Sequence, residues 1–160
     1  MLMTLLNISN SAGNLLYYTT AYSLSGIAAF AVILYVCKNK DNEDIANFNG
    51  LGKNNPLMAA VLTASLLSMA GIPIFAGFFA KMFLFNQVID AGYLVVVIAA
   101  VINSIISVGY YFKLILAMYN KEPNEEATKT PFVFYAVAII SILLNIAIGL
   151  FPSAVLDLLG

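Results

Sequence analysis

The sequence predicts an all-α integral membrane protein with four transmembrane segments, the second of which is a discontinuous helix. Hydrophobic residues make up 62% of the 160-residue chain and charged residues only 9%, a composition far outside that of soluble domains. Four apolar segments reach the length of about 20 helical residues that a bilayer core of about 30 Å requires. The expected spans, which form one membrane domain over residues 1–160, are residues 15–37, 57–89, 93–119 and 131–151.

Composition also excludes several kinds of function. The net charge is −1, so no field attracts nucleic acid. The chain has no histidine and one cysteine, Cys37, which excludes an internal disulfide, a cysteine-held iron–sulfur cluster and a multi-cysteine zinc site. We interpret Cys37 as a small apolar filler. The run GLGK at residues 50–53 is followed by Asn54 instead of the Ser or Thr of a phosphate loop. We therefore expect no metal and no cofactor site in this chain.

The first span is expected to begin after Asn14, a residue type that caps helix N-termini. Tyr18, Tyr22 and Ser25 follow helical spacing on one face of this span. Taken singly, such side chains usually bond their own backbone or a neighbouring helix. Together they could extend a polar path through the membrane.

The second segment is too long for one straight span, because its 33 residues would extend about 50 Å as a helix. Pro73 lacks an amide donor and would clash with the carbonyl of Met69, and Gly71 allows the backbone to leave helical geometry. These residues predict a break near residues 70–73. Carbonyls freed there are costly in lipid, so the break should face protein or water, as in transporters with discontinuous helices. A simple proline kink is the alternative interpretation.

Lys81 lies in the same segment, eight residues after Pro73. A lysine deep in a span costs about 2.5–3.5 kcal/mol on insertion scales, so such residues are rare and usually functional. Burial disfavours the ammonium form, which suits a buried lysine to exchanging a proton. The broken helix would supply water access and oriented dipoles. Snorkelling of the side chain to the outer interface is the alternative.

Polar side chains that could extend a path from Lys81 recur on the second and third spans, and on the third they share roughly one helix face. They are Ser68, Asn103, Ser107 and Tyr110. Lys113 follows on the third span, but it stands close to the end of that span, and snorkelling is the favoured interpretation over a proton role.

The remaining segment ends carry helix signals as well. Asn55 and Thr130 stand at N-cap positions, and Pro56 and Pro131 follow them at the first helical position. Gly92 fits the turn between the second and third spans.

The distribution of lysines predicts the topology. The linkers at residues 38–55 and 120–130 hold five lysines, whereas the turn at residues 90–92 holds none. By the positive-inside rule, both linkers are cytoplasmic and both termini lie on the outer side. Most of the tyrosines near the span ends are interpreted as interfacial anchors; they are Tyr17, Tyr18, Tyr93 and Tyr119.

The first residues, MLMTLL, read as the tail of an apolar segment. We expect Met1 to be an internal position of a longer protein, and a short interfacial N-terminus is the alternative.

The run GLGKNNPLMAAVLTASLLSMAGIPIFAGFFAKMFLF at residues 50–85 carries a close resemblance to a known family. The resemblance is to the antiporter-like membrane subunits of the proton-pumping NADH:quinone oxidoreductase, complex I, and among them to the subunit N group. It continues through VINSIISVGYYFKLILAMY at 101–119 and GLFPSAVLDL at 149–158, and it begins at LLYYTTAYSLSGIAAFAVI, residues 15–33. The family fold contains two inverted helix repeats, and this sequence resembles the end of the second.

The resemblance implies a function. The lysine of the family's broken helix is a proton-relay residue, which corresponds to Lys81, and a basic residue in the following helix corresponds more weakly to Lys113. The implied function is proton translocation coupled to NADH oxidation and quinone reduction, with no redox centre in this chain. NADH, flavin, iron–sulfur clusters and quinone would be bound by other subunits of the complex.

The expected surroundings are the lipid bilayer of a bacterial inner membrane and the other membrane subunits of complex I. Two alternatives remain. One is a subunit of a related cation/proton antiporter or membrane-bound hydrogenase, and the other is a structural membrane fragment without transport.

Overall fold

The computed structural model describes residues 12–38, 40–120, 122 and 131–159, and all the regular secondary structure in these residues is helical. The expected all-α class is confirmed. In chain order the elements are α1 (Ala12–Cys37), the 3₁₀ helix η3 (Ile45–Phe48), α2 (Leu51–Asn54), α3 (Pro56–Ala70), α4 (Ala76–Asp90), α5 (Leu94–Asn120), α6 (Phe132–Leu150) and α7 (Pro152–Leu159).

Three helices in the described part of the chain are long and apolar enough to cross a membrane, namely α1, α5 and α6. α3 is a shorter apolar helix of 15 residues. The second predicted segment, residues 57–89, falls on α3 and α4, which are separated by residues 71–75.

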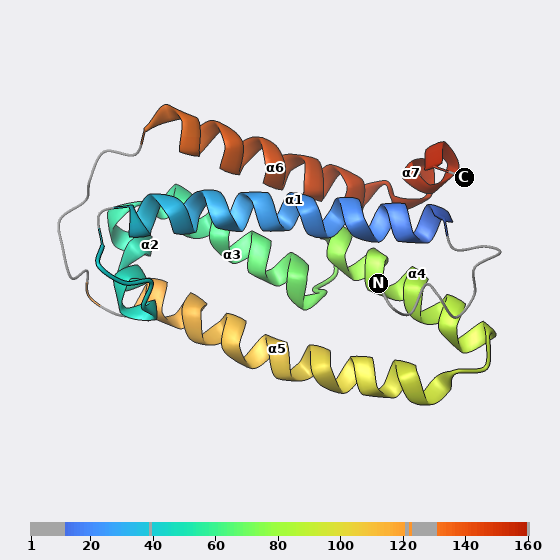
Figure 1. Cartoon of the computed structure of the whole chain (residues 1–160). Helices are drawn as coiled ribbons and strands as arrows, with labels where there is room; N and C mark the ends of the chain where they lie inside the picture. Colours follow the sequence, from blue (N-terminus) through green and yellow to red (C-terminus); the bar gives the residue numbers. More distant parts are fainter. Residues whose placement is uncertain (1–11, 39, 121, 123–130, 160) are drawn as a thin grey trace.

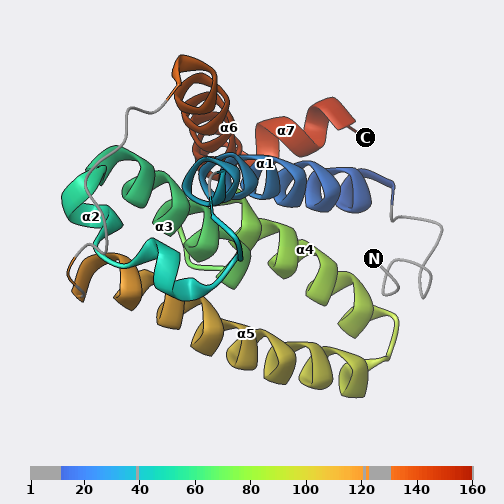
Figure 2. The ribbon, with the colours of Figure 1, turned by 60° about the vertical axis from the view of Figure 1, so that its left-hand side comes forward.

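Helix α1 lies at the centre of the bundle (Figure 1). α6 packs along one side of it, and α3 and α4 pack along the other. α5 runs along α3 and α4 on the side away from α6, as the turned view also shows (Figure 2). The central position of α1 follows from its small buried residues Ala21, Ala28 and Ala29, because small side chains allow membrane helices to approach closely.

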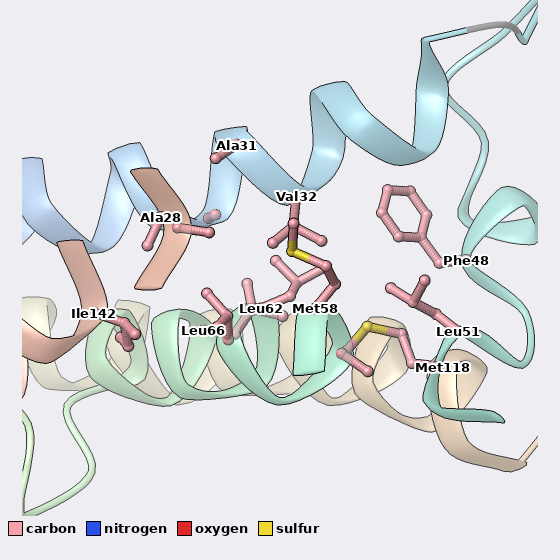
Figure 3. Close-up of a cluster of buried hydrophobic side chains, with 14 residues drawn as sticks. Ala28, Ala31, Val32, Phe48, Leu51, Met58, Leu62, Leu66, Met118 and Ile142 are labelled. Carbon is pink, nitrogen blue, oxygen red and sulfur yellow. The ribbon is translucent and has the colours of Figure 1, made fainter. Parts of the chain in front are cut away.

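A buried apolar cluster ties the α2 end of the bundle together (Figure 3). Val32 of α1, Met58 and Leu62 of α3 and Met118 of α5 are all fully enclosed. Methionine has a flexible, polarisable side chain that fills irregular gaps between helices. This cluster fixes the N-terminal part of α3. The C-terminal end of α3, at Ala70, is held by polar contacts.

The helix ends differ in part from the sequence prediction. Asn55 caps α3 as predicted: its Oδ1 accepts from the Met58 amide at 3.3 Å, and Pro56 is the first helical residue. The prediction for Asn14 was wrong, because α1 already begins at Ala12, so Asn14 lies inside the helix and its side chain donates to Gln87. Pro131 precedes the first residue of α6 instead of occupying that position.

One of the four predicted anchor tyrosines belongs to the protein interior. Tyr17 is fully buried, and its hydroxyl donates to the Ile148 carbonyl at 3.0 Å. An anchor has its hydroxyl at the water interface, so this interpretation of Tyr17 was wrong. Met1 and Thr130 lie outside the described residues, and the expectations about them stay predictions.

Candidate functional site

Helix α3 ends in the Schellman arrangement at Gly71. The backbone of Gly71 is left-handed, with φ 88° and ψ 37°, a conformation that glycine adopts without steric cost. The Gly71 amide donates to the Ser68 carbonyl at 3.0 Å and the Ile72 amide donates to the Leu67 carbonyl at 3.0 Å. The last four carbonyls of a helix have no partner within the helix. In α3, two of these four, those of Leu67 and Ser68, accept hydrogen bonds in this way.

Side chains satisfy the other two carbonyls. The Tyr22 hydroxyl from α1 donates to the Met69 carbonyl at 3.3 Å, and the Lys81 Nζ from α4 donates to the Ala70 carbonyl at 3.0 Å. Each of the last four carbonyls of α3 therefore has a hydrogen-bond partner. A lysine at this place also complements the negative end of the α3 dipole.

Lys81 connects three helices. It belongs to the second turn of α4, it caps α3 through Ala70, and its Nζ also bonds the Ser104 Oγ of α5 at 3.2 Å. The side chain is half-buried. Within the described residues, no carboxylate pairs with Lys81. The cation is thus held by two neutral oxygen atoms.

Lys81 stands between two cavities. The first, about 450 Å³, lies between α4 and α5 and has mostly apolar walls, and Gly71 and Ser104 are among its lining residues. The second, about 270 Å³, is bounded by α1, α3, α4 and α5 and is rich in polar side chains. Lys81 and Ser104 line both cavities. The polar residues that line the second cavity besides these two are Tyr18, Tyr22, Asn103, Ser107, Tyr110 and Tyr111.

The structure brings together most of the residues that the sequence singled out. Asn103, Ser107 and Tyr110 share the second cavity with Lys81. Ser68 lines neither cavity and instead takes part in a buried hydrogen-bond cluster. Lys113 is exposed on α5 and also lines neither of these two cavities.

The junction between α3 and α4 is held tightly. Pro73 lies at its exposed surface, and Ile74 has a φ of 101°, which is an outlier for a β-branched residue. A Cβ at Gly77 would lie 1.9 Å from the Ser68 carbonyl oxygen, and a Cβ at Gly149 of α6 would lie 2.5 Å from the Ile74 carbonyl oxygen. Glycine at position 77 lets α4 pack directly against the backbone of α3 at Ser68, and glycine at position 149 lets α6 pack directly against the backbone at Ile74.

Two residues of the site were missed by sequence reasoning. Ser104 neighbours Asn103 in the chain but points to Lys81, and helical spacing from Asn103 alone did not select it. Asn145 is fully buried in α6 and bonds residues of α1 and α3. An asparagine in the middle of a very apolar helix was a usable signal, since polar groups in membrane spans commonly bond neighbouring helices.

Comparison with known proteins shows the family of this chain. Residues 1–107 match the family described as "NADH:quinone oxidoreductase/Mrp antiporter, TM". The chain belongs to this family. The resemblance indicated by residues 50–85 is thereby confirmed.

Relatives of the NADH:quinone oxidoreductase/Mrp antiporter family align along nearly the whole chain. The chain is 79% identical over 160 residues to the NADH-quinone oxidoreductase subunit N of Flavobacterium johnsoniae, covering 100% of this chain and 35% of the relative. It is 57% identical over 159 residues to the subunit of the same name from Flavobacterium psychrophilum, covering 99% of this chain and 35% of the relative. The chain thus spans about a third of the length of these relatives.

A solved structure has the same fold. A chain in the structure of respiratory complex I from Thermus thermophilus with bound aureothin matches with a TM-score of 0.85 and 30% sequence identity. The match covers 97% of this chain and 36% of that chain.

Proposed function

We propose that this chain forms part of a proton-translocating membrane subunit of NADH:quinone oxidoreductase, respiratory complex I. The observation that carries the proposal is the position of Lys81, which caps the broken end of α3 and stands between two cavities. The high identity to proteins named subunit N supports the choice of this complex.

In this proposal, α3 and α4 together form a fourth, discontinuous span. Residues 71–75 interrupt the helix, with Gly71 ending α3 and Pro73 following two residues later. The satisfied carbonyls support this interpretation, because an interruption inside a membrane requires a partner for every freed backbone group. A kinked but continuous helix would not release the Ala70 carbonyl to Lys81.

Proton transfer in this proposal uses Lys81 as the group that gains and loses the proton. The ammonium of Lys81 gives a proton to water in the second cavity and becomes a neutral amine, which is then reprotonated from the other side of the membrane. A volume of about 270 Å³ holds several water molecules at about 30 Å³ each. Asn103, Ser107 and Tyr110 line this cavity and would orient such water.

Lys113 would have a secondary role near the end of the path. It lies ten residues after Asn103 on α5 and has an exposed side chain. In the complete subunit, this amine would take up protons at the cytoplasmic surface or extend into the interface by snorkelling.

Other subunits of the complex would bind the redox groups and surround this chain in the membrane. NADH, flavin, iron–sulfur clusters and quinone are assigned to other subunits, and the other membrane subunits of complex I are the expected partners. The bacterial relatives support placement in the inner membrane. The linkers would face the cytoplasm and both ends of the chain the outer side.

Replacement of Lys81 tests this function. Membrane vesicles that contain the complete complex with Lys81→Ala are expected to pump fewer protons per NADH oxidised than wild-type vesicles, because the proton-binding group is gone. The measurement is the ratio of proton uptake to NADH oxidation at equal amounts of assembled complex.

The matched control is Lys53→Ala. Lys53 is an exposed lysine of α2 whose partner is Glu122, and its loss should leave the ratio unchanged. An unchanged ratio in Lys81→Ala would contradict the relay and favour a structural role for the chain.

A second candidate is a cation/proton antiporter, because the matched family also includes the Mrp antiporters. Native electrophoresis of the membranes separates the two candidates. Comigration of the protein with NADH-oxidising activity supports complex I, and a protein that migrates apart from this activity supports the antiporter.

A further inference from the structure

Three buried side chains form a closed hydrogen-bond ring behind the junction of α3 and α4. Asn145 of α6 donates from Nδ2 to the Ser25 Oγ of α1 at 3.0 Å. Ser25 Oγ lies 2.9 Å from the Ser68 Oγ of α3, and Ser68 Oγ lies 3.0 Å from the Asn145 Oδ1. At most 1% of each residue is exposed. The ring therefore joins three helices through groups that water does not reach.

Every polar hydrogen of the ring has an acceptor. The Asn145 amide has two hydrogens, and they serve Ser25 Oγ and the Ala21 carbonyl, the latter at 3.0 Å. The Ala21 carbonyl can only accept, which fixes the orientation of the amide. The Ser68 hydrogen then goes to Asn145 Oδ1. The Ser25 hydrogen is shared between Ser68 Oγ at 2.9 Å and the Ala21 carbonyl of its own helix at 3.0 Å. All the polar hydrogens of the three side chains are used.

Ser68 also contacts the other side of the break. Its Oγ accepts from the Gly77 amide in the first turn of α4 at 3.4 Å. That amide is one of those at a helix start that lack a partner in the helix. Ser68 lies two residues before Ala70, whose carbonyl accepts from Lys81. The same hydroxyl thus fixes the end of α3 and touches the start of α4.

We propose that Asn145 and Ser68 are positioning residues for Lys81: the ring that they form with Ser25 holds the two halves of the broken helix in the register that places Lys81 Nζ on the Ala70 carbonyl. The inference rests on the proposed function of Lys81 and adds residues that do not themselves carry the proton. Loss of the ring lets α3 and α4 shift relative to each other, so that Lys81 no longer caps α3 or stands between the cavities.

The test compares two serines of one helix. Ser68→Ala breaks the ring. Ser65→Ala is the matched control, because Ser65 is equally buried on α3 and its hydroxyl bonds only the Val61 carbonyl of its own helix, at 2.8 Å. A second ring variant, Asn145→Leu, replaces the amide with an apolar side chain of similar size. The conservative variant Ser68→Thr keeps the hydroxyl.

The readout is the number of protons pumped per NADH in vesicles, normalised to the amount of assembled complex. A variant that only assembles in smaller amounts therefore keeps the wild-type ratio. We expect Ser68→Ala and Asn145→Leu to lower the ratio by a loss comparable with that of Lys81→Ala. Ser65→Ala should match the wild type, and Ser68→Thr should recover most of the ratio.

The outcomes separate this inference from the proposed function. If Lys81→Ala lowers the ratio while Ser68→Ala and Asn145→Leu retain the wild-type value, the ring is structural and the inference is overturned. It is also overturned if Ser65→Ala lowers the ratio as far as Ser68→Ala does. If Lys81→Ala has no effect, the proposed function fails first, and the inference fails with it.

Discussion

Lys81 donates to a main-chain carbonyl and to a serine hydroxyl, and neither acceptor carries a net charge. A carboxylate partner would make loss of the proton costly, because the remaining acid would be a buried and unpaired charge. Two neutral oxygens hold the ammonium without that penalty. After the ammonium has lost a proton, the neutral amine can still donate a hydrogen bond to either oxygen. The partners of Lys81 thus suit a group that changes its charge repeatedly.

Gly71 links backbone conformation to the position of Lys81. We expect Gly71→Ala to destabilise the protein by about 1–2 kcal/mol, because a side chain is strained in the left-handed region. The added Cβ would also lie 3.1 Å from the Lys81 Cδ and press on that side chain. The variant should therefore lose thermal stability in detergent and also pump fewer protons per NADH.

Gly92 supplies the control that separates these two effects. It has a similar φ of 84°, and nothing lies within 4 Å of a Cβ built on it. Gly92→Ala should lose comparable stability and keep its pumping ratio. Equal ratios in Gly71→Ala and Gly92→Ala would show that the contact with Lys81 is unimportant.

At the scale of helices, the break depends on contact between the end of α3 and the start of α4. Gly77→Ala is expected to cost at least about 1–3 kcal/mol, the range for overpacked sites, because its Cβ would lie 1.9 Å from a backbone oxygen that cannot swing away. This cost is measured as a lower melting temperature of the purified complex. Two probes report the melt: the loss of quinone-reductase activity and the unfolding of the subunit.

Gly109→Ala in α5 is the comparison for Gly77→Ala. A Cβ at Gly109 meets nothing within 4 Å, and replacing a helical glycine by alanine usually stabilises by about 0.5–1 kcal/mol. If both variants melt like the wild type, α3 and α4 are not packed as closely as the structure has them.

Across the bundle, the charged side chains of the described residues lie at its ends, apart from Lys81 and Lys113. Among the described residues, Lys38, Lys40 and Lys53 gather at the α2 end, where an ion pair joins Lys53 to Glu122. Asp90 is the last residue of α4, whose end lies at the opposite end of the bundle (Figure 1). This distribution suits helices that cross a bilayer between two aqueous surfaces.

The topology can be tested by cysteine labelling. In a Cys37→Ser background, Asp41→Cys should react with a membrane-impermeant maleimide from the cytoplasmic side, and Asp90→Cys from the outer side, because the positive-inside rule assigns the lysine-bearing linker to the cytoplasm. Both positions are exposed. Labelling of intact cells and of inverted vesicles distinguishes the sides, and a reversed pattern would refute the assignment.

The all-α class, the approximate positions of the long helices and the choice of Lys81 as a candidate residue followed from the sequence alone. Apolar content, segment length and the pair Gly71 and Pro73 are local properties, and the chain displays them without being folded. Family membership could be inferred for the same reason, since residues 50–85 carry the resemblance in a continuous run. The errors at Asn14 and Tyr17 arose where a local signal competed with packing, because both side chains found partners on distant helices.

The surroundings of Lys81 depend on how the helices pack and could not be predicted from the sequence. Its partners Ala70 and Ser104 stand 11 and 23 residues away in the chain, and no spacing rule within one helix selects them. The residues of the hydrogen-bond ring are even farther apart in the sequence, because Asn145 lies 77 residues from Ser68 and 120 residues from Ser25. Hydrogen bonds between helices depend on how the helices rotate and slide against each other, and that is settled by packing of the whole bundle.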